Sequence, residues 1–227
     1  MLPCYSCFGE DIMDFAYIGN LFVSMLGGIK YTLGLFVITA VLSMPLGLIL
    51  MFMRISKNKI LQGVTGFYVW LMRGTPLLLQ LYFFYYGLGL ISPALAMGRF
   101  QAACVAFVLN YAAYFCEIFR GGMLSIDKGQ HEAARVLGFN KVQSTMKIVV
   151  PQMLRVCLPP ISNECITLVK DTALVTAIGV TEILYFAKTA VNRDVDVTAY
   201  IVAAAFYLIM TYVVTQLFKF LEKKFKY

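Results

Sequence analysis

Charged side chains are scarce in this sequence. Only 14% of the 227 residues are Asp, Glu, Lys or Arg, while 60% are hydrophobic. Soluble domains carry about 25% charged residues, so this composition excludes an ordinary globular domain and indicates a membrane protein. The charges present sum to +7. Basic residues gathered at an anionic cytoplasmic membrane surface account for that excess, and no nucleic-acid partner is expected.

Catalytic motifs are also missing. The sequence contains no HExxH, no GxSxG nucleophile elbow and no GxxxxGK[ST] phosphate loop. We therefore expect no enzymatic activity and no cofactor. Any work driven by ATP requires another chain that binds the nucleotide.

Metal-ligating residues are few. Histidine occurs once, at His131, and a CxxC pattern occurs once, at Cys4 and Cys7. A lone pair so far from the histidine is weak evidence for zinc, so no metal site is expected, and ordinary thiols or a disulfide remain open. The amino terminus lacks the basic start of a secretory signal and is expected to stay on the protein. The other cysteines adjoin apolar runs and are expected to act as small hydrophobic side chains: 104, 116, 157 and 165.

Long apolar runs are abundant. Tyr31 to Met53 and Thr198 to Phe218 carry no charge and are long enough to cross the roughly 20-residue thickness of a bilayer core. Three further runs contain isolated charges and cover residues 60–98, 100–119 and 151–179. We predict an all-α membrane protein with five transmembrane helices. Residues 1–30 are predicted as an extracytoplasmic or interfacial segment, and residues 31–227 as the transmembrane domain.

The loop charges predict the orientation, because cytoplasmic loops carry an excess of Lys and Arg. Thirteen Lys or Arg residues lie in one set of loops, which covers residues 54–59, 120–155 and the tail from Lys219; four lie in the opposite set. The amino terminus is therefore predicted outside and the carboxyl terminus in the cytoplasm.

A polar loop at about 122–150 contains SIDKGQHEAARVLGFN. Ser125 suits a helix cap and Asp127 a first turn, and the helix formers continue to Leu137. Gly138 stands where a left-handed residue would end this helix. The Ala133–Ala134 pair leaves a surface without bulk that another protein's backbone can approach. A solvated loop helix is the alternative.

A second feature is a charge followed by a helix break. Arg73 precedes Gly74, Thr75 and Pro76; we expect Thr75 to cap a new helix and Pro76 to take its first position. Arg73 lies thirteen residues from the cytoplasmic start of its span near residue 60, or about 20 Å into a core about 30 Å thick. Glu164 lies equally far along the span that starts at 151, so the two residues are predicted at similar depth.

Intramembrane charges are costly and usually mark a pathway or a pair. Arg73 and the broken helix suit the carboxylate of an amino acid, and Glu164 suits its ammonium group. The alternative is an Arg73–Glu164 ion pair that only joins two helices. Glu117, Lys170 and Asp171 are expected to be structural or gating residues.

Several motifs together resemble one family. The EAARVLG segment, with Ile148 and Pro151 beyond it, is similar to the EAA motif of permease subunits of bacterial ATP-binding cassette importers. The segments RGTPLLLQLYFFYYGLGL, NYAAYFCEIFRGGMLSIDKGQ and LPPISNECITLVKDTALVTAIGV resemble the polar amino acid permeases of the histidine, glutamine and arginine type.

The resemblance implies the fold of type I importer permeases in the bacterial cytoplasmic (inner) membrane, surrounded by lipid. It implies a coupling helix that docks on a cytoplasmic ATPase subunit, with contacts from Glu132, Ala133, Ala134 and Gly138. It implies a second permease subunit, identical or related, and an extracytoplasmic solute-binding protein. The expected substrate is a polar amino acid, held by Arg73, Thr75, Glu164 and Thr167.

Two other classes of function are open on residues alone. A membrane-embedded lipid or peptide enzyme would need clustered Asp, Glu or His on one face, which the sequence lacks. An ion channel or structural membrane protein would need no EAA-like loop. Copurification of an ATPase with this chain separates the importer from both.

Overall fold

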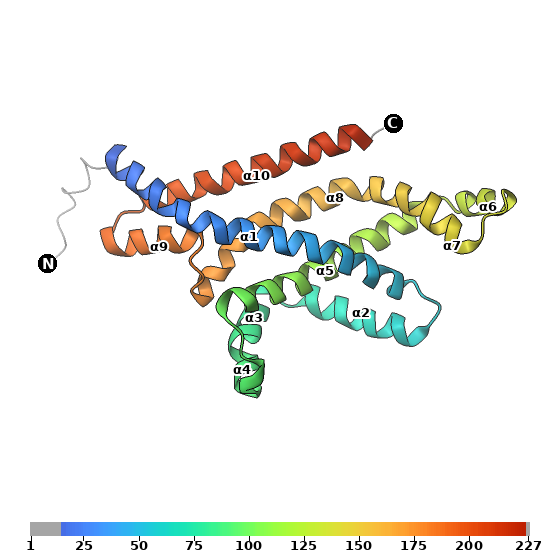
Figure 1. Cartoon of the computed structure of the whole chain (residues 1–227), viewed down its shortest axis with the longest axis horizontal. Helices are drawn as coiled ribbons and strands as arrows, with labels where there is room; N and C mark the ends of the chain where they lie inside the picture. Colours follow the sequence, from blue (N-terminus) through green and yellow to red (C-terminus); the bar gives the residue numbers. More distant parts are fainter. Residues whose placement is uncertain (1–14, 226–227) are drawn as a thin grey trace.

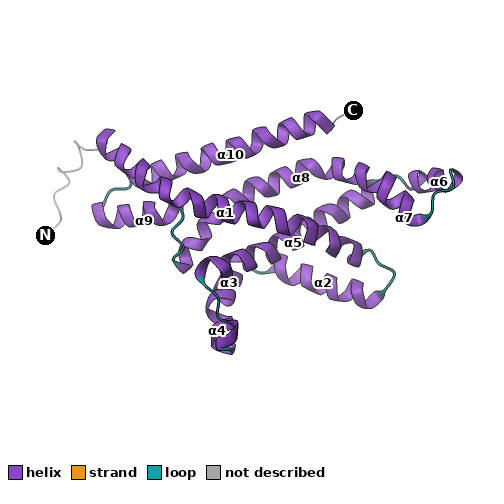
Figure 2. Cartoon of the chain, in the orientation of Figure 1, coloured by secondary structure: helices purple, strands orange, loops and turns teal. Residues whose placement is uncertain are grey.

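The computed structural model describes residues 15–225, and this part of the chain is helical with no strand (Figure 2). The elements follow in the order α1 Phe15–Arg54, α2 Lys59–Gly74, α3 Leu77–Tyr82, η2 Phe83–Gly87, α4 Leu88–Ile91, η3 Pro93–Leu95, α5 Arg99–Ser125, α6 Lys128–Val136, α7 Lys141–Ser144, η4 Thr145–Val149, α8 Val150–Asp171, η5 Thr172–Ile178, α9 Ile183–Asp194 and α10 Thr198–Phe225. The all-α prediction is confirmed.

Within residues 15–225, three helices are long and apolar enough to cross a membrane: α1, α5 and α10. Two further candidates are bent pairs. The helix that ends at Gly74 meets the next at 103°, and the segment that ends at Ile178 meets α9 at 54°. Five spans result if each bent pair counts as one span. The predicted five is therefore the upper value that the structure allows.

Helix α1 runs without a break from Phe15 through the predicted domain boundary at residue 30. Two of its glycines permit close contacts with other elements. A Cβ at Gly47 would lie 2.7 Å from the Cβ of Phe115, and one at Gly28 would lie 2.7 Å from the backbone of Glu182. These contacts fix α1 against α5 and against the start of α9. Cys4 and Cys7 lie outside the described residues.

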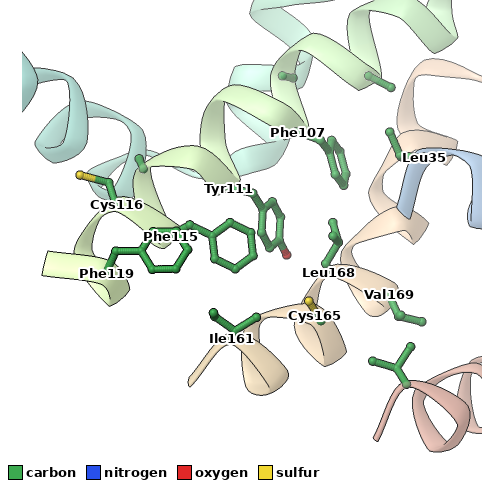
Figure 3. Packing of buried hydrophobic residues seen from close by; sticks show 14 of the residues in the cluster. Leu35, Phe107, Tyr111, Phe115, Cys116, Phe119, Ile161, Cys165, Leu168 and Val169 are labelled. Atoms are coloured by element: carbon green, nitrogen blue, oxygen red, sulfur yellow. The ribbon is translucent and has the colours of Figure 1, made fainter. Parts of the chain in front are cut away.

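The main core lies between α5 and α8 (Figure 3). Aromatic rings one turn apart follow α5, and those of Phe115 and Phe119 are stacked with centroids 6.3 Å apart. The α8 side chains that face them include Ile161, Cys165 and Leu168. The cysteines at 116, 157 and 165 are buried and free, so the prediction that they pack as small hydrophobic residues is confirmed.

The bundle has two distinct ends (Figure 1). Helices α6 and α7, the α1–α2 loop and the carboxyl end of α10 lie at one end, and α9 lies at the other with the starts of α1 and α10. The three Lys- and Arg-rich segments therefore share one end. The α3–α4 limb projects sideways from the bundle.

Candidate translocation path and coupling loop

The predicted helix break after Arg73 is present. Helix α2 ends at Gly74, and Thr75 (φ −115°, ψ 145°) and Pro76 (φ −60°, ψ 134°) are extended. Two details of the prediction are wrong. Thr75 does not cap the new helix: its hydroxyl donates to the Leu71 carbonyl at 2.8 Å, at the end of α2. Pro76 is the N-cap, and Leu77 is the first helical residue. Pro76 is itself extended and not helical, so the helix starts one residue later than predicted and the cap position falls on Pro76.

Two buried amides hold this break, and the sequence reasoning missed both. The Gln80 Nε2 donates to the carbonyls of Met72 at 2.9 Å and Thr75 at 3.2 Å, and to Thr75 Oγ1 at 2.7 Å. Asn110 Nδ2 on α5 donates to the Met72 carbonyl at 2.9 Å and to Gln80 Oε1 at 3.0 Å. The sequence does contain a signal for them. Both amides stand within apolar runs, and a buried polar group requires hydrogen-bond partners.

Arg73 lies beside an aromatic ring and a carboxylate of α5. Its guanidinium carbon is 5.2 Å from the centroid of the Tyr114 ring, and its Nη1 is 4.0 Å from Glu117 Oε2. Its side chain keeps 43% exposure. No ion pair joins Arg73 to Glu164 within residues 15–225. The ion pair considered as the alternative from the sequence is therefore not formed.

The Glu117 carboxylate lies close to three arginine side chains. Its Oε1 accepts a hydrogen bond from Arg54 Nε at 2.9 Å, and its Oε2 accepts one from Arg120 Nη2 at 2.7 Å. With Arg73 at 4.0 Å, three guanidinium groups surround one carboxylate. The cluster joins the end of α1, the end of α2 and α5, which agrees with the structural role expected for Glu117.

Glu164 and Thr167 occupy α8 one turn apart. Glu164 is half-buried and Thr167 is exposed. Neither side chain makes a hydrogen bond or ion pair with the described residues, whereas Asp171 on the same helix accepts a hydrogen bond from the Tyr111 hydroxyl at 2.7 Å. The Glu164 carboxylate therefore keeps its acceptor sites for a group from outside residues 15–225.

The polar loop folds as the helix α6 with the predicted stop. Gly138 has φ 79°, so the left-handed residue is confirmed. The Phe139 N–H donates to the Ala134 carbonyl and the Gly138 N–H to the Arg135 carbonyl, each at 3.0 Å, which is a Schellman ending. The predicted cap is wrong. Ser125 is the last residue of α5 and donates to the Gly122 carbonyl, so Asp127 caps α6 instead.

The surface of α6 is partly apolar. Ala134 is 1% exposed and packs inside this chain, whereas Glu132 and Ala133 are exposed. Four large apolar side chains on α6, on α7 and just beyond each of these helices are exposed. We call them the α6–α7 patch: Val136, Leu137, Val142 and Met146. This patch lies at the end of the bundle away from α9 (Figure 1). An apolar surface presented outside the spans is typical of a protein interface.

Comparison with known proteins identifies the chain. Residues 43–227 match the family described as "Binding-protein-dependent transport system inner membrane component". The chain belongs to this family. The permease is 39% identical to the octopine transport system permease protein OccM of Rhizobium radiobacter, over 92% of this chain and 89% of that protein. It is 37% identical to the L-cystine transport system permease protein TcyB of Bacillus subtilis, over 87% and 85%.

A solved structure agrees with these relatives. The permease matches a chain from the crystal structure of an amino acid ABC transporter with histidines, with a TM-score of 0.85 and 30% identity over 93% of this chain and 99% of that one. The permease is a membrane-embedded transporter subunit and not itself an enzyme, since ATP hydrolysis belongs to a partner ATPase. Its fold is that of ABC transporter permeases.

The second bend of the permease depends on a residue that the sequence analysis did not single out. Glu182 is 0% exposed and caps α9 by accepting from the Tyr185 N–H at 2.9 Å. Its carboxylate also accepts from the hydroxyls of Thr176 and, at 2.6 Å, Tyr207. Gly179 precedes it with φ 75°. These contacts tie η5, α9 and α10 together. No local motif in the sequence marks Glu182 as buried.

Proposed function

We propose that this permease subunit pairs with a second permease chain, receives a polar amino acid from an extracytoplasmic binding protein, and imports it with energy from two ATPase subunits. Three relatives are named for octopine, L-cystine and arginine transport, which supports an amino acid or a related compound as cargo. The Lys- and Arg-rich segments at one end of the bundle support placing that end in the cytoplasm.

The substrate contacts in this proposal are Arg73, Thr75, Glu164 and Thr167. One observation carries it: Arg73 and Glu164 are both accessible and unpaired with each other, and Glu164 has no hydrogen-bond partner in residues 15–225. A charge left without a partner at membrane depth is costly, so a ligand with complementary charges would stabilise it. Arg73 would hold the carboxylate and Glu164 the ammonium group.

A double-mutant cycle tests this assignment. Arg73→Gln and Glu164→Gln should each reduce uptake into vesicles that contain the complete transporter, and the double variant should not recover. Glu222→Gln and Lys223→Gln on α10 serve as controls, because they remove the same charges at another place in the chain. Near-wild-type uptake and apparent affinity in the double variant, at matched expression, would reject the substrate role.

Coupling to the ATPase is assigned to α6. Glu132, Ala133 and the α6–α7 patch would contact the ATPase, Ala134 would pack α6 against its own chain, and Gly138 would set the turn that follows α6. Gly138→Leu introduces a side chain at φ 79°, where a Cβ is penalised by about 1–2 kcal/mol. We expect lost uptake and lost substrate stimulation of ATP hydrolysis, with normal membrane insertion.

The control for this variant is Gly63→Leu. Gly63 lies in α2, and a Cβ there meets nothing within 4 Å, so the added bulk should be tolerated. Substrate-stimulated ATPase activity and uptake at wild-type levels in Gly138→Leu would contradict the coupling role.

The second permease chain is proposed because one subunit leaves large apolar side chains exposed. The α3–α4 limb exposes Leu79, Phe83 and Leu90, an apolar surface that another subunit or lipid must cover. Cross-linking between limbs and the mass of the purified complex would test this arrangement. A fully active reconstituted complex with a single membrane chain would refute it.

A further inference from the structure

A cavity of about 450 Å³ lies between the end of α1, the helix α2 and the last turns of α5. Arg54 and Ile55 from α1 and its loop, Gln62 from α2, and Arg120 and Leu124 from α5 line it. The substrate contacts proposed above are not among these lining residues.

Arg54 and Arg120 of the cavity lining belong to a neighbouring cluster of charges that is positive overall. Arg54, Arg73 and Arg120 share one carboxylate, that of Glu117, which leaves two positive charges uncompensated in the cluster. Arg54 uses only Nε, and Arg120 uses Nε and Nη2, in hydrogen bonds with the described residues. Arg54 Nη2 and Arg120 Nη1 make no hydrogen bond with the described residues, and guanidinium groups bind phosphate oxygens well.

The guanidinium of Arg54 is held in place by its surroundings. Its Nε donates to Glu117, and its Nη1 lies so close to α2 that a Cβ at Gly66 would be 2.5 Å away. The absence of a side chain at Gly66 therefore lets the Arg54 guanidinium rest against α2, one turn from Gln62. The donor groups of the cavity are positioned before any ligand arrives.

The rim of the cavity is apolar. Ile55 is 41% exposed and Leu124 is 68% exposed. A soluble phosphate compound would leave these side chains in contact with water, whereas a phospholipid places its glycerol and upper acyl chains beside them. Basic pockets at the cytoplasmic side of membrane helices suit anionic lipid headgroups.

We propose that this cavity binds the phosphate of an anionic phospholipid of the cytoplasmic leaflet. The phosphodiester lies between Arg54 and Arg120 with Gln62 as a further donor, and the glycerol contacts Ile55 and Leu124. The lipid thereby bridges α1, α2 and α5 at the cytoplasmic end.

Native mass spectrometry of the purified full chain tests this site, with phosphatidylglycerol as the probe and phosphatidylethanolamine as the neutral comparison. Gln62→Glu adds a negative charge to the cavity without removing any partner of Glu117. It should weaken phosphatidylglycerol binding about tenfold, because the new carboxylate would repel the negatively charged phosphate. Gln62→Lys should bind at least as tightly as wild type.

Lys219→Gln changes the net charge of the chain by the same amount as Gln62→Glu, at an exposed position of α10. Its phosphatidylglycerol affinity should equal that of wild type. Equal affinity of Gln62→Glu and wild type, or equal binding of the two lipids by wild type, would overturn the proposal. Displacement of phosphatidylglycerol by millimolar inorganic phosphate would instead assign the cavity to a soluble phosphate compound and overturn the lipid assignment.

Discussion

The two bent spans break in opposite chemical ways. After α2 the backbone becomes extended, and the groups left without helical partners include the carbonyls of Met72 and Thr75. Before α9 the chain tightens into a 3₁₀ helix and turns at a left-handed glycine, and the group that needs a partner is the Tyr185 N–H. The first break is held by amide donors and the second by a carboxylate acceptor.

The difference follows from which end of a helix is exposed. A helix carboxyl end presents carbonyls and needs donors, while an amino end presents N–H groups and needs acceptors. In a bilayer neither end can rely on water, so the protein supplies a side chain of matching polarity. Gln80 and Asn110 serve the first break, and Glu182 serves the second.

Glu182→Gln should have the largest effect on stability. The amide keeps only one acceptor oxygen, so either the Tyr207 hydroxyl, or the Thr176 hydroxyl and the Tyr185 N–H, would lose its acceptor in a site with 0% exposure. A buried unsatisfied donor costs about 1–3 kcal/mol, so we expect about 3 kcal/mol lost from the free energy of unfolding in detergent. Glu222→Gln on α10 is the control. Equal thermal unfolding of the two variants would show that the hydrogen bonds to Glu182 do not stabilise the second break.

Gln80→Glu replaces the amide donor at the first break by a carboxylate, the opposite of Glu182→Gln. It should lower the free energy of unfolding by about 2 kcal/mol. The carbonyls of Met72 and Thr75 accept from the Gln80 amide in the wild type, and in the variant they would face a second acceptor oxygen. Gln216→Glu, at an exposed position of α10, should stay within about 0.5 kcal/mol of wild type. Thermal unfolding measures both. A stable Gln80→Glu protein would mean that the break does not depend on donors.

The glycines of the two breaks should differ in their tolerance of alanine. Gly179 has φ 75° and would bring a Cβ to 3.4 Å from the Arg99 guanidinium, so Gly179→Ala should cost about 1–2 kcal/mol. Gly74 has open space for a Cβ and no left-handed backbone, so Gly74→Ala should change stability by less than about 0.5 kcal/mol. Similar losses of unfolding free energy in the two variants would show that the left-handed backbone of Gly179 does not matter.

The smallest effect is expected at the link between the two bent spans. Arg99 donates from Nε to the Tyr85 hydroxyl at 3.3 Å and from Nη1 to the Gly179 carbonyl at 3.4 Å. These contacts are long and exposed, so Arg99→Gln should cost about 0.5 kcal/mol. Hydrogen–deuterium exchange should quicken in residues 83–98 and stay unchanged in α10. Unchanged exchange in residues 83–98 would show that the link is not restraining the limb.

Counting residues gives an expected depth but no direction. Thirteen residues along each helix predict similar heights for Arg73 and Glu164, because the rise per residue is constant. Which side chains meet depends on the rotation of each helix about its axis, and a run that is apolar on every side does not define that rotation. For this reason the ion-pair partner of Arg73 is Glu117, and not Glu164 as in the alternative drawn from the sequence.

Local chemistry was predicted more successfully than distant contacts. The Gly-Thr-Pro sequence signalled the first break, and Gly138 signalled the end of α6, because proline and left-handed positions constrain the backbone of their own neighbours. Gln80 meets Asn110 across 30 positions of sequence, and Glu182 meets Tyr207 across 25. Such pairs depend on how the whole bundle packs, which no local pattern records.

The length of α1 sets how the molecule sits in bilayers of different thickness. Its 40 residues extend about 60 Å, twice a hydrocarbon core of about 30 Å, and even a tilt of about 40° leaves about 46 Å along the bilayer normal. The surplus equals about fourteen residues, close to the stretch before the exposed Lys30. This stretch of α1 packs against Glu182 and Ile183 through Gly28, Leu21 and Met25. A change in bilayer thickness should therefore shift α1 and the second bent span together, and not α1 alone.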